Sequence, residues 1–132
     1  KKEINTVYNL FRNNLKNLIL LHCISSYPCK EEDSFLQNIN IMKSNYNCEI
    51  GLSDHTPNIK TSIIAKAMGV NIFEKHFKLQ NQKCVDEAVS IDPKKFIELR
   101  HEAILIDKIK GNGKFGLKHT EKFAKQFKRY SK

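Results

Sequence analysis

A chain of 132 residues, 40% hydrophobic and 28% charged, has the composition of one globular domain and not of a disordered chain. No run approaches the roughly 20 apolar residues that span a bilayer, and no apolar signal segment follows the first residues, so we expect a cytoplasmic protein. The net charge of +9 comes almost entirely from the end of the chain. Residues 1–107 hold 14 basic and 13 acidic residues, whereas residues 108–132 hold nine basic residues and one acidic residue. A nearly neutral body argues against a dedicated nucleic-acid-binding domain.

The first half of the chain predicts helix, strand, helix and strand in that order. Residues 3–14 and 33–46 carry apolar residues at helical spacing and predict amphipathic helices. Residues 17–23 include a nearly continuous apolar run that fits a strand buried in a parallel sheet, and residues 48–52 predict a second strand. We expect the apolar side of the second helix to consist of Phe35, Leu36, Ile39 and Met42.

The second half repeats the alternation. Thr56-Pro57 predicts a helix start, with threonine as N-cap and proline at the first helical position, and Gly69 predicts its end. A third strand is expected at residues 70–73. Asp92-Pro93 repeats the start signal and opens the longest helix, which Gly111 ends. The apolar stripe of the helix after Thr56-Pro57 is predicted to be Ile59, Ile63, Ile64 and Ala67.

This alternation predicts an α/β fold of three parallel strands with about four helices. Three strands cannot close a barrel and leave their outer edges unpaired, so we interpret residues 1–111 as part of a larger parallel α/β domain. Residues 112–132 are rich in glycine and lysine and are predicted to form a basic linker or tail.

Histidines follow two consecutive predicted strands at the ends where parallel α/β folds bind ligands. Strand alternation puts Ser53 and His55 on one face, and likewise Glu74 and His76. Two neutral imidazoles meeting at such an edge would make an open divalent-metal site. From these residues alone, a structural role for the histidines stays equally open.

The residues between these positions are expected to point the other way, towards the surrounding helices. Asp54 lies between Ser53 and His55 and should turn off the barrel axis to a backbone N–H group. Lys75 should point away from His76. The four cysteines form no C-x-x-C pair, and we expect all of them to be reduced and structural: Cys23, Cys29, Cys48 and Cys84.

The segments LLHCISSYP, EIGLSDHT and IFEKHF, in this order and spacing, resemble the sialic acid synthase family, which includes the N-acetylneuraminate, legionaminate and pseudaminate synthases. The resemblance covers roughly residues 3–111. It implies that the chain is the C-terminal portion of a (β/α)₈ TIM barrel. It also implies a transferase that condenses phosphoenolpyruvate with an N-acetylated mannosamine-like sugar and releases phosphate.

The resemblance further implies roles for particular residues. His55 and His76 would hold a divalent metal, manganese by expectation, with magnesium and cobalt as alternatives. The metal would polarise the sugar carbonyl, and Glu74 would handle a proton or a metal-bound water. The catalytic group is therefore His55, His76 and Glu74. The predicted substrate-binding residues are Ser53 for the phosphate of phosphoenolpyruvate, and Ser25, Tyr27 and Asp86 for the sugar.

One departure from the family pattern concerns the loop that carries a G-P-D element in relatives, because Cys84-Val85-Asp86-Glu87 stands there in this chain. The altered loop leaves the preferred sugar open. The resemblance also implies a homodimer for the full-length protein. The lysines that bind phosphoenolpyruvate lie on earlier strands of the family's barrel, so we expect the isolated chain to be inactive.

Two alternatives stand beside the synthase. The chain could be a small basic protein whose tail binds RNA or an acidic partner, because aromatic residues that can stack on bases alternate there with lysines. These residues are Phe115, Phe123, Phe127 and Tyr130. The chain could also be an inactive remnant of a synthase.

Overall fold

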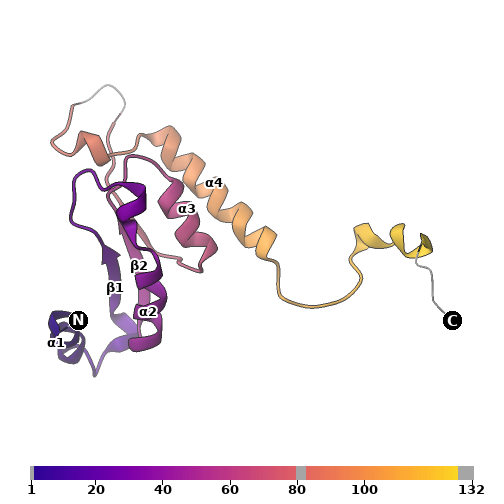
Figure 1. Ribbon diagram of the computed structural model, residues 1–132, viewed down its shortest axis with the longest axis horizontal. Coiled ribbons are helices and arrows are strands. Elements are labelled where there is room, and N and C mark those ends of the chain that lie inside the picture. Colours follow the sequence, from indigo (N-terminus) through magenta and orange to yellow (C-terminus); the bar gives the residue numbers. More distant parts are fainter. Residues whose placement is uncertain (1, 80–82, 128–132) are drawn as a thin grey trace.

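The structure, a computed structural model, describes residues 2–79 and 83–127 (Figure 1). A parallel β-α-β-α-β arrangement follows an N-terminal helix, and one long helix closes the body. The helices and strands are α1 (Lys2–Leu10), β1 (Ile19–Cys23), α2 (Gln37–Asn45), β2 (Glu49–Asp54), α3 (Lys60–Ala67), β3 (Phe73–Lys75) and α4 (Pro93–Lys110). Short 3₁₀ helices lie at Leu15–Asn17, Glu31–Ser34, Glu87–Val89, His119–Glu121 and Ala124–Phe127.

The sheet has the order β1-β2-β3, with both pairs of neighbours parallel. Its register places Cys23 beside Ser53, and Ser53 beside Glu74. The carboxyl ends of the three strands therefore meet at one edge. This edge brings together residues as far apart in the chain as Cys23 and Glu74.

Helices α2 and α3 contact β2, and α4 packs on α3. Ile50 and Leu52 of β2 join these helices in the core, so the alternate residues Gly51 and Ser53 lie on the opposite face. The main core cluster consists of Ile39, Tyr46, Ile50, Leu52, Ala65 and Val70. A second cluster under α4 consists of Ile59, Ile91 and Leu99.

The predicted start of the third helix at Thr56-Pro57 is wrong, because α3 begins at Lys60. The hydroxyl of Thr56 bonds to Asp54 Oδ1 at 2.8 Å instead of to the first turn of the helix. Asn58 accepts the Lys60 N–H through Oδ1 at 2.8 Å and so closes a turn just before the helix. Because the Thr56 hydroxyl is bound to the Asp54 carboxylate, it is not available to cap the helix that the local pattern predicts at this position.

Three side chains predicted to lie on apolar helix faces are exposed: Phe35, Ile64 and Ala67. Phe35 is exposed because it precedes α2 in a left-handed conformation, with φ of 43°, and so lies off the helix face. Ile64 is exposed, whereas its neighbour Ala65 is fully buried against the sheet. The first helix is shorter than residues 3–14 and ends at Leu10.

The predicted boundaries of the last helix are confirmed. Asp92 caps α4 by accepting the Lys95 N–H at 2.8 Å, Pro93 occupies the first turn, and Gly111 follows with φ of 61°. Gly69 ends α3 with φ of 86°.

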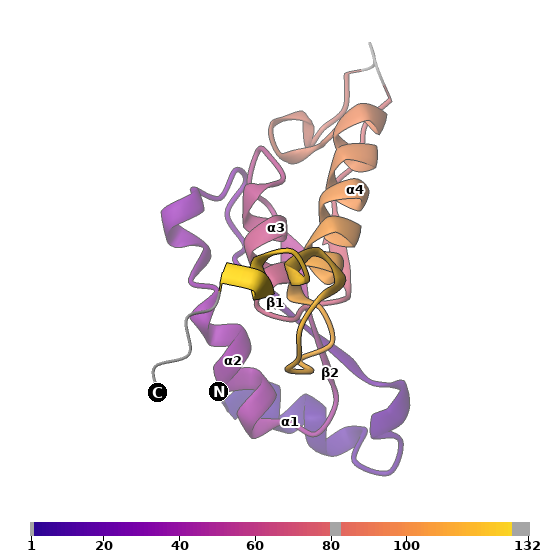
Figure 2. The ribbon, with the colours of Figure 1, turned by 90° about the vertical axis from the view of Figure 1, so that its right-hand side faces the viewer.

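Beyond α4 the chain runs away from the body, and the described tail residues 112–127 are all exposed (Figures 1 and 2). The division into a barrel part and a basic tail stays a prediction. In the part of the chain that the structure describes, no helix has the length and apolar character needed to cross a membrane.

Candidate functional site

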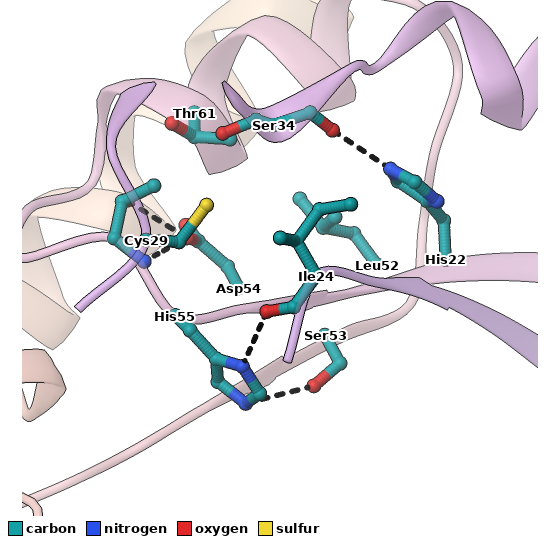
Figure 3. Close-up of a pocket in the computed structure, with 10 residues that line it drawn as sticks. His22, Ile24, Cys29, Ser34, Leu52, Ser53, Asp54, His55 and Thr61 are labelled. Atoms are coloured by element: carbon teal, nitrogen blue, oxygen red, sulfur yellow. Dashed lines mark hydrogen bonds between the residues drawn. The ribbon is translucent and has the colours of Figure 1, made fainter. Parts of the chain in front are cut away.

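The loop after β1 holds both the imidazole and the backbone of His55, and Figure 3 shows the contact between the ring and Ile24. Nδ1 of the ring lies 3.0 Å from the carbonyl oxygen of Ile24. A carbonyl can only accept, so Nδ1 carries the proton and Nε2 presents a lone pair. The carbonyl of His55 accepts the Cys29 N–H at 2.9 Å. The loop after β1 is thereby tied to both the ring and the backbone of His55.

The ring of His76, like that of His55, has its Nδ1 next to an oxygen acceptor. Its Nδ1 lies 3.5 Å from Oδ2 of Asp86, a residue on the loop between β3 and α4. Because a carboxylate accepts hydrogen bonds, this contact favours a proton on Nδ1 and leaves Nε2 available. The side chain of His76 is 30% exposed, so the ring borders open space.

Three rings gather at the strand ends. The centroids of the His55 and His76 rings lie 5.2 Å apart, and the two ring planes meet at 66°. The Tyr27 ring lies 4.2 Å from His55 and 5.7 Å from His76, and this tyrosine is 54% exposed. The imidazoles therefore form one pair, covered on one side by the tyrosine.

Ser53 and Glu74 complete the cluster. The Ser53 hydroxyl donates to Glu74 Oε1 at 2.7 Å, which links β2 to β3. The same hydroxyl oxygen is 3.5 Å from Nε2 of His55. Because its single proton is directed at Glu74, Ser53 cannot also donate to Nε2. Within the described residues, no hydrogen-bond donor is therefore directed at the Nε2 lone pair of His55.

Asp54 and Lys75 lie on the other face of the strands, as the alternation predicts. Lys75 Nζ is 3.4 Å from Asp54 Oδ1, and each side chain is only 1% exposed. Burial lowers the pKa of the Lys75 ammonium from its ordinary value, while Asp54 acts in the opposite direction. The prediction that Asp54 turns to a backbone N–H is confirmed, since Oδ1 accepts the Thr56 N–H at 2.8 Å.

The profile of the NeuB family matches residues 1–115. The chain belongs to the NeuB family.

Known relatives of this NeuB-family chain include an uncharacterised protein of Methanocaldococcus jannaschii, 42% identical over 105 residues, which span 79% of this chain and 31% of that protein. The N,N'-diacetyllegionaminic acid synthase of Campylobacter jejuni is 34% identical over 115 residues, which span 84% of this chain and 34% of the synthase. The chain thus spans about a third of the length of these relatives.

Among solved structures, the fold matches the N-acetylneuraminic acid synthetase of Leptospira borgpetersenii in complex with citrate. The TM-score is 0.83 at 36% identity, over 96% of this chain and 45% of that one. The resemblance to the sialic acid synthases and the fold class, three parallel strands with four helices that match part of a synthase barrel, are both confirmed.

The structure brings together most of the predicted site residues of the NeuB-family chain. Ser25 is the exception: it is exposed on the loop after β1, and within residues 2–79 and 83–127 no side-chain hydrogen bond joins it to the others. The gathered set is Tyr27, Ser53, His55, Glu74, His76 and Asp86.

Some partners of the site were missed at the sequence level. Cys23, expected to be a small structural residue, is exposed at the end of β1, with Sγ 3.8 Å from Nδ1 of His55. The contact between Ile24 and His55 could not be predicted from residue types, because it comes from the backbone carbonyl of Ile24 and not from its side chain. The contact between the Asp86 carboxylate and His76 was not predicted, and the expected contact of Asp86 with the sugar stays a prediction. All four cysteines are free thiols, as predicted.

The histidine pair fits the donor set of a divalent first-row metal. Both rings direct Nδ1 to an oxygen acceptor, and this arrangement is the usual support of a metal-binding imidazole that ligates through Nε2. Over the described residues, no group of three or more histidine, cysteine or acidic side chains gathers into a complete metal site. An ion held here would therefore keep positions open to other ligands.

Proposed function

We propose that this chain is the metal-binding and sugar-binding part of a nonulosonic acid synthase. The whole enzyme would condense phosphoenolpyruvate with an N-acetylated mannosamine-like sugar and release phosphate. The observation that carries the proposal is the pair of imidazoles at adjacent strand ends, 5.2 Å apart, each with Nδ1 directed at an oxygen acceptor. The names of relatives as legionaminic and sialic acid synthases support the same reaction class.

His55 and His76 would hold a divalent metal, manganese by expectation, through Nε2. When bound, such an ion supplies Lewis-acid polarisation of the sugar carbonyl. The contacts of Ile24 and Asp86 keep each ring in the tautomer that ligation needs. Magnesium and cobalt remain alternatives.

The other side chains of the cluster would bind substrate and move a proton. Glu74 is fixed by the hydroxyl of Ser53 and lies beside the histidine pair, so its carboxylate is placed to accept or return a proton. Ser53 would contact the phosphate of phosphoenolpyruvate by turning its hydroxyl proton from Glu74 to a phosphate oxygen. The half-exposed ring of Tyr27 would line the sugar site, together with Ser25 and Asp86.

The remainder of the synthase would supply the groups that bind phosphoenolpyruvate, and the full-length enzyme would be a homodimer. We therefore expect the isolated chain to release no phosphate from phosphoenolpyruvate. A chimera tests the proposal. Residues 1–115 replace the matching segment of the Leptospira synthetase, which is 36% identical.

The chimera should release phosphate when phosphoenolpyruvate, N-acetylmannosamine and Mn²⁺ are present. His55→Ala or His76→Ala should abolish this release. The matched control is His101→Ala, because His101 is exposed on α4. A folded chimera that is inactive with every N-acetylated hexosamine tried would reject the proposed reaction. Equal activity in all three variants would reject the proposed roles of the histidines.

A further inference from the structure

A buried ion pair lies directly behind the two histidines. Asp54 and Lys75 are register partners on β2 and β3, and each immediately precedes one of the histidines. Lys75 Nζ lies 3.4 Å from Asp54 Oδ1, and the two side chains are 1% exposed. The ion pair therefore joins the two strand ends from which His55 and His76 project.

Asp54 fixes the turn that contains His55. Its Oδ1 accepts hydrogen bonds from both the N–H and the hydroxyl of Thr56, each at 2.8 Å. Its Oδ2 accepts the hydroxyl of Ser62 on α3 at 2.6 Å. The chain on the far side of His55 is thus tied back to the strand, and the strand is tied to a helix.

Lys75 holds the same turn from the neighbouring strand. Its ammonium donates to the carbonyl of Asp54 at 3.1 Å and to the carbonyl of Thr56, the two residues that flank His55. The ammonium also forms an ion pair with the Asp54 carboxylate, at 3.4 Å. The Lys75 ammonium is thus directed at the turn around His55, and the side chain of Lys75 is only 1% exposed.

We propose that Lys75 and Asp54 are positioning residues that set the separation and orientation of the His55 and His76 rings. The link to metal binding rests on the function proposed above. A buried ion pair contributes little net stability compared with an apolar pair of the same size. An apolar pair, however, would not hold the two carbonyls that flank His55. Orientation of the turn is thus the property that this ion pair supplies and a simple apolar core would lack.

The test uses two variants and a matched control. Lys75→Met removes the ammonium but keeps most of the side-chain volume. The double variant Asp54→Asn/Lys75→Met removes both charges. The asparagine Oδ1 can still accept from Thr56, and its Nδ2 can donate to the Ser62 hydroxyl, which donates to Asp54 in the wild-type chain. The control is Lys66→Met, because the largely buried Lys66, 10% exposed, pairs with the exposed Asp107 at 2.8 Å, between α3 and α4 and away from the histidines.

Two readouts are taken on the 132-residue chain. The first is metal-free: NMR of the imidazole nitrogens reports the tautomer of His55, and a nuclear Overhauser effect reports its closeness to His76. The second is Co²⁺ affinity, followed through the d–d absorption of the ion. In both Lys75 variants we expect the ring-to-ring Overhauser effect to weaken and Co²⁺ affinity to fall about 10-fold or more, as for loss of other groups that orient metal ligands.

The double variant separates positioning from stability. It should regain much of the stability lost in Lys75→Met, because no unpaired charge stays buried, yet its affinity for Co²⁺ should stay low. Lys66→Met should keep wild-type NMR signals and affinity. Wild-type ring geometry in the double variant would overturn the proposal. If the wild-type chain binds no Co²⁺, the metal-binding function fails, while the NMR comparison still decides whether the ion pair positions the rings.

Discussion

Gly51 lies in the middle of β2, where the structure leaves no room for a side chain. A Cβ built at this position would lie 2.6 Å from Leu21 Cδ2 and 2.7 Å from the carbonyl oxygen of Ile72. The first contact involves the end of a flexible side chain that can rotate. The second involves backbone that cannot easily move, because the Ile72 oxygen also accepts the Leu52 N–H at 3.0 Å.

Gly51→Ala should therefore destabilise the chain by about 1–3 kcal/mol, the usual cost of forcing an extra carbon into a packed site. Where space allows, a Gly→Ala substitution stabilises a protein by about 0.4–1 kcal/mol, because it lowers the conformational entropy of the unfolded chain. A loss of stability in Gly51→Ala would therefore indicate the steric clash, and a gain would indicate that there is none. Ile72 directly precedes β3, which begins at Phe73. Relief of the clash would shift the strand that leads to His76.

Urea unfolding followed by circular dichroism at the helix band measures the stability, and Co²⁺ titration measures the site. With a slope of about 1–3 kcal/mol per molar urea, we expect the midpoint to fall by roughly 1 M and Co²⁺ affinity to weaken with it. The double variant Leu21→Ala/Gly51→Ala removes only the side-chain clash, so Co²⁺ affinity should stay weak. A Gly51→Ala chain as stable as wild type would refute the packing argument.

Three further predictions concern the body of the protein. Ile39→Ala should lose about 2–5 kcal/mol of unfolding free energy in urea, because Ile39 is 0% exposed in the main core; a loss below 1 kcal/mol would mean that this core is loosely packed. Asp92→Ala should cost about 1 kcal/mol, since it removes the cap of α4, whereas Asp92→Asn should cost less; equal losses would contradict the capping role. Burial raises the pKa of the Cys29 and Cys48 thiols. At pH 8 these two should react slowly with a disulfide reagent, because the thiolate is the reactive form. The stability that the two buried thiols contribute should be lost as the pH rises from the ordinary thiol pKa through the raised pKa of the folded state. The fast-reacting pair should be the exposed thiols, Cys23 and Cys84; four equal rates at pH 8 would contradict the burial.

The local pattern of residues predicted the elements whose determinants are close together in the chain. Asp92-Pro93 starts α4 because a cap and a fixed φ act within one turn, and Gly69 ends α3 because its φ of 86° suits glycine. Thr56-Pro57 carries the same start signal as Asp92-Pro93 and fails. A buried carboxylate, which a local pattern does not register, takes the threonine hydroxyl.

The same distinction applies to the site. The period of two along a strand was enough to place His55 and His76 on one face, and Asp54 and Lys75 on the other, because side-chain direction in a strand is a local property. The partner of each imidazole was not predictable in this way. The Ile24 oxygen lies 31 residues from the ring that it orients.

The sequence by itself thus determined the family, the order of helices and strands, and the positions of His55 and His76 at neighbouring strand ends. Each of these depends on residue types at fixed short spacings. Only the tertiary structure decided the protonated nitrogen of His55, the contact of Asp86 with His76, and the bonds from Lys75 across the turn. These depend on the register of parallel strands and on how loops fold over their ends. Contacts between segments far apart in the chain fix both, and no local pattern encodes them.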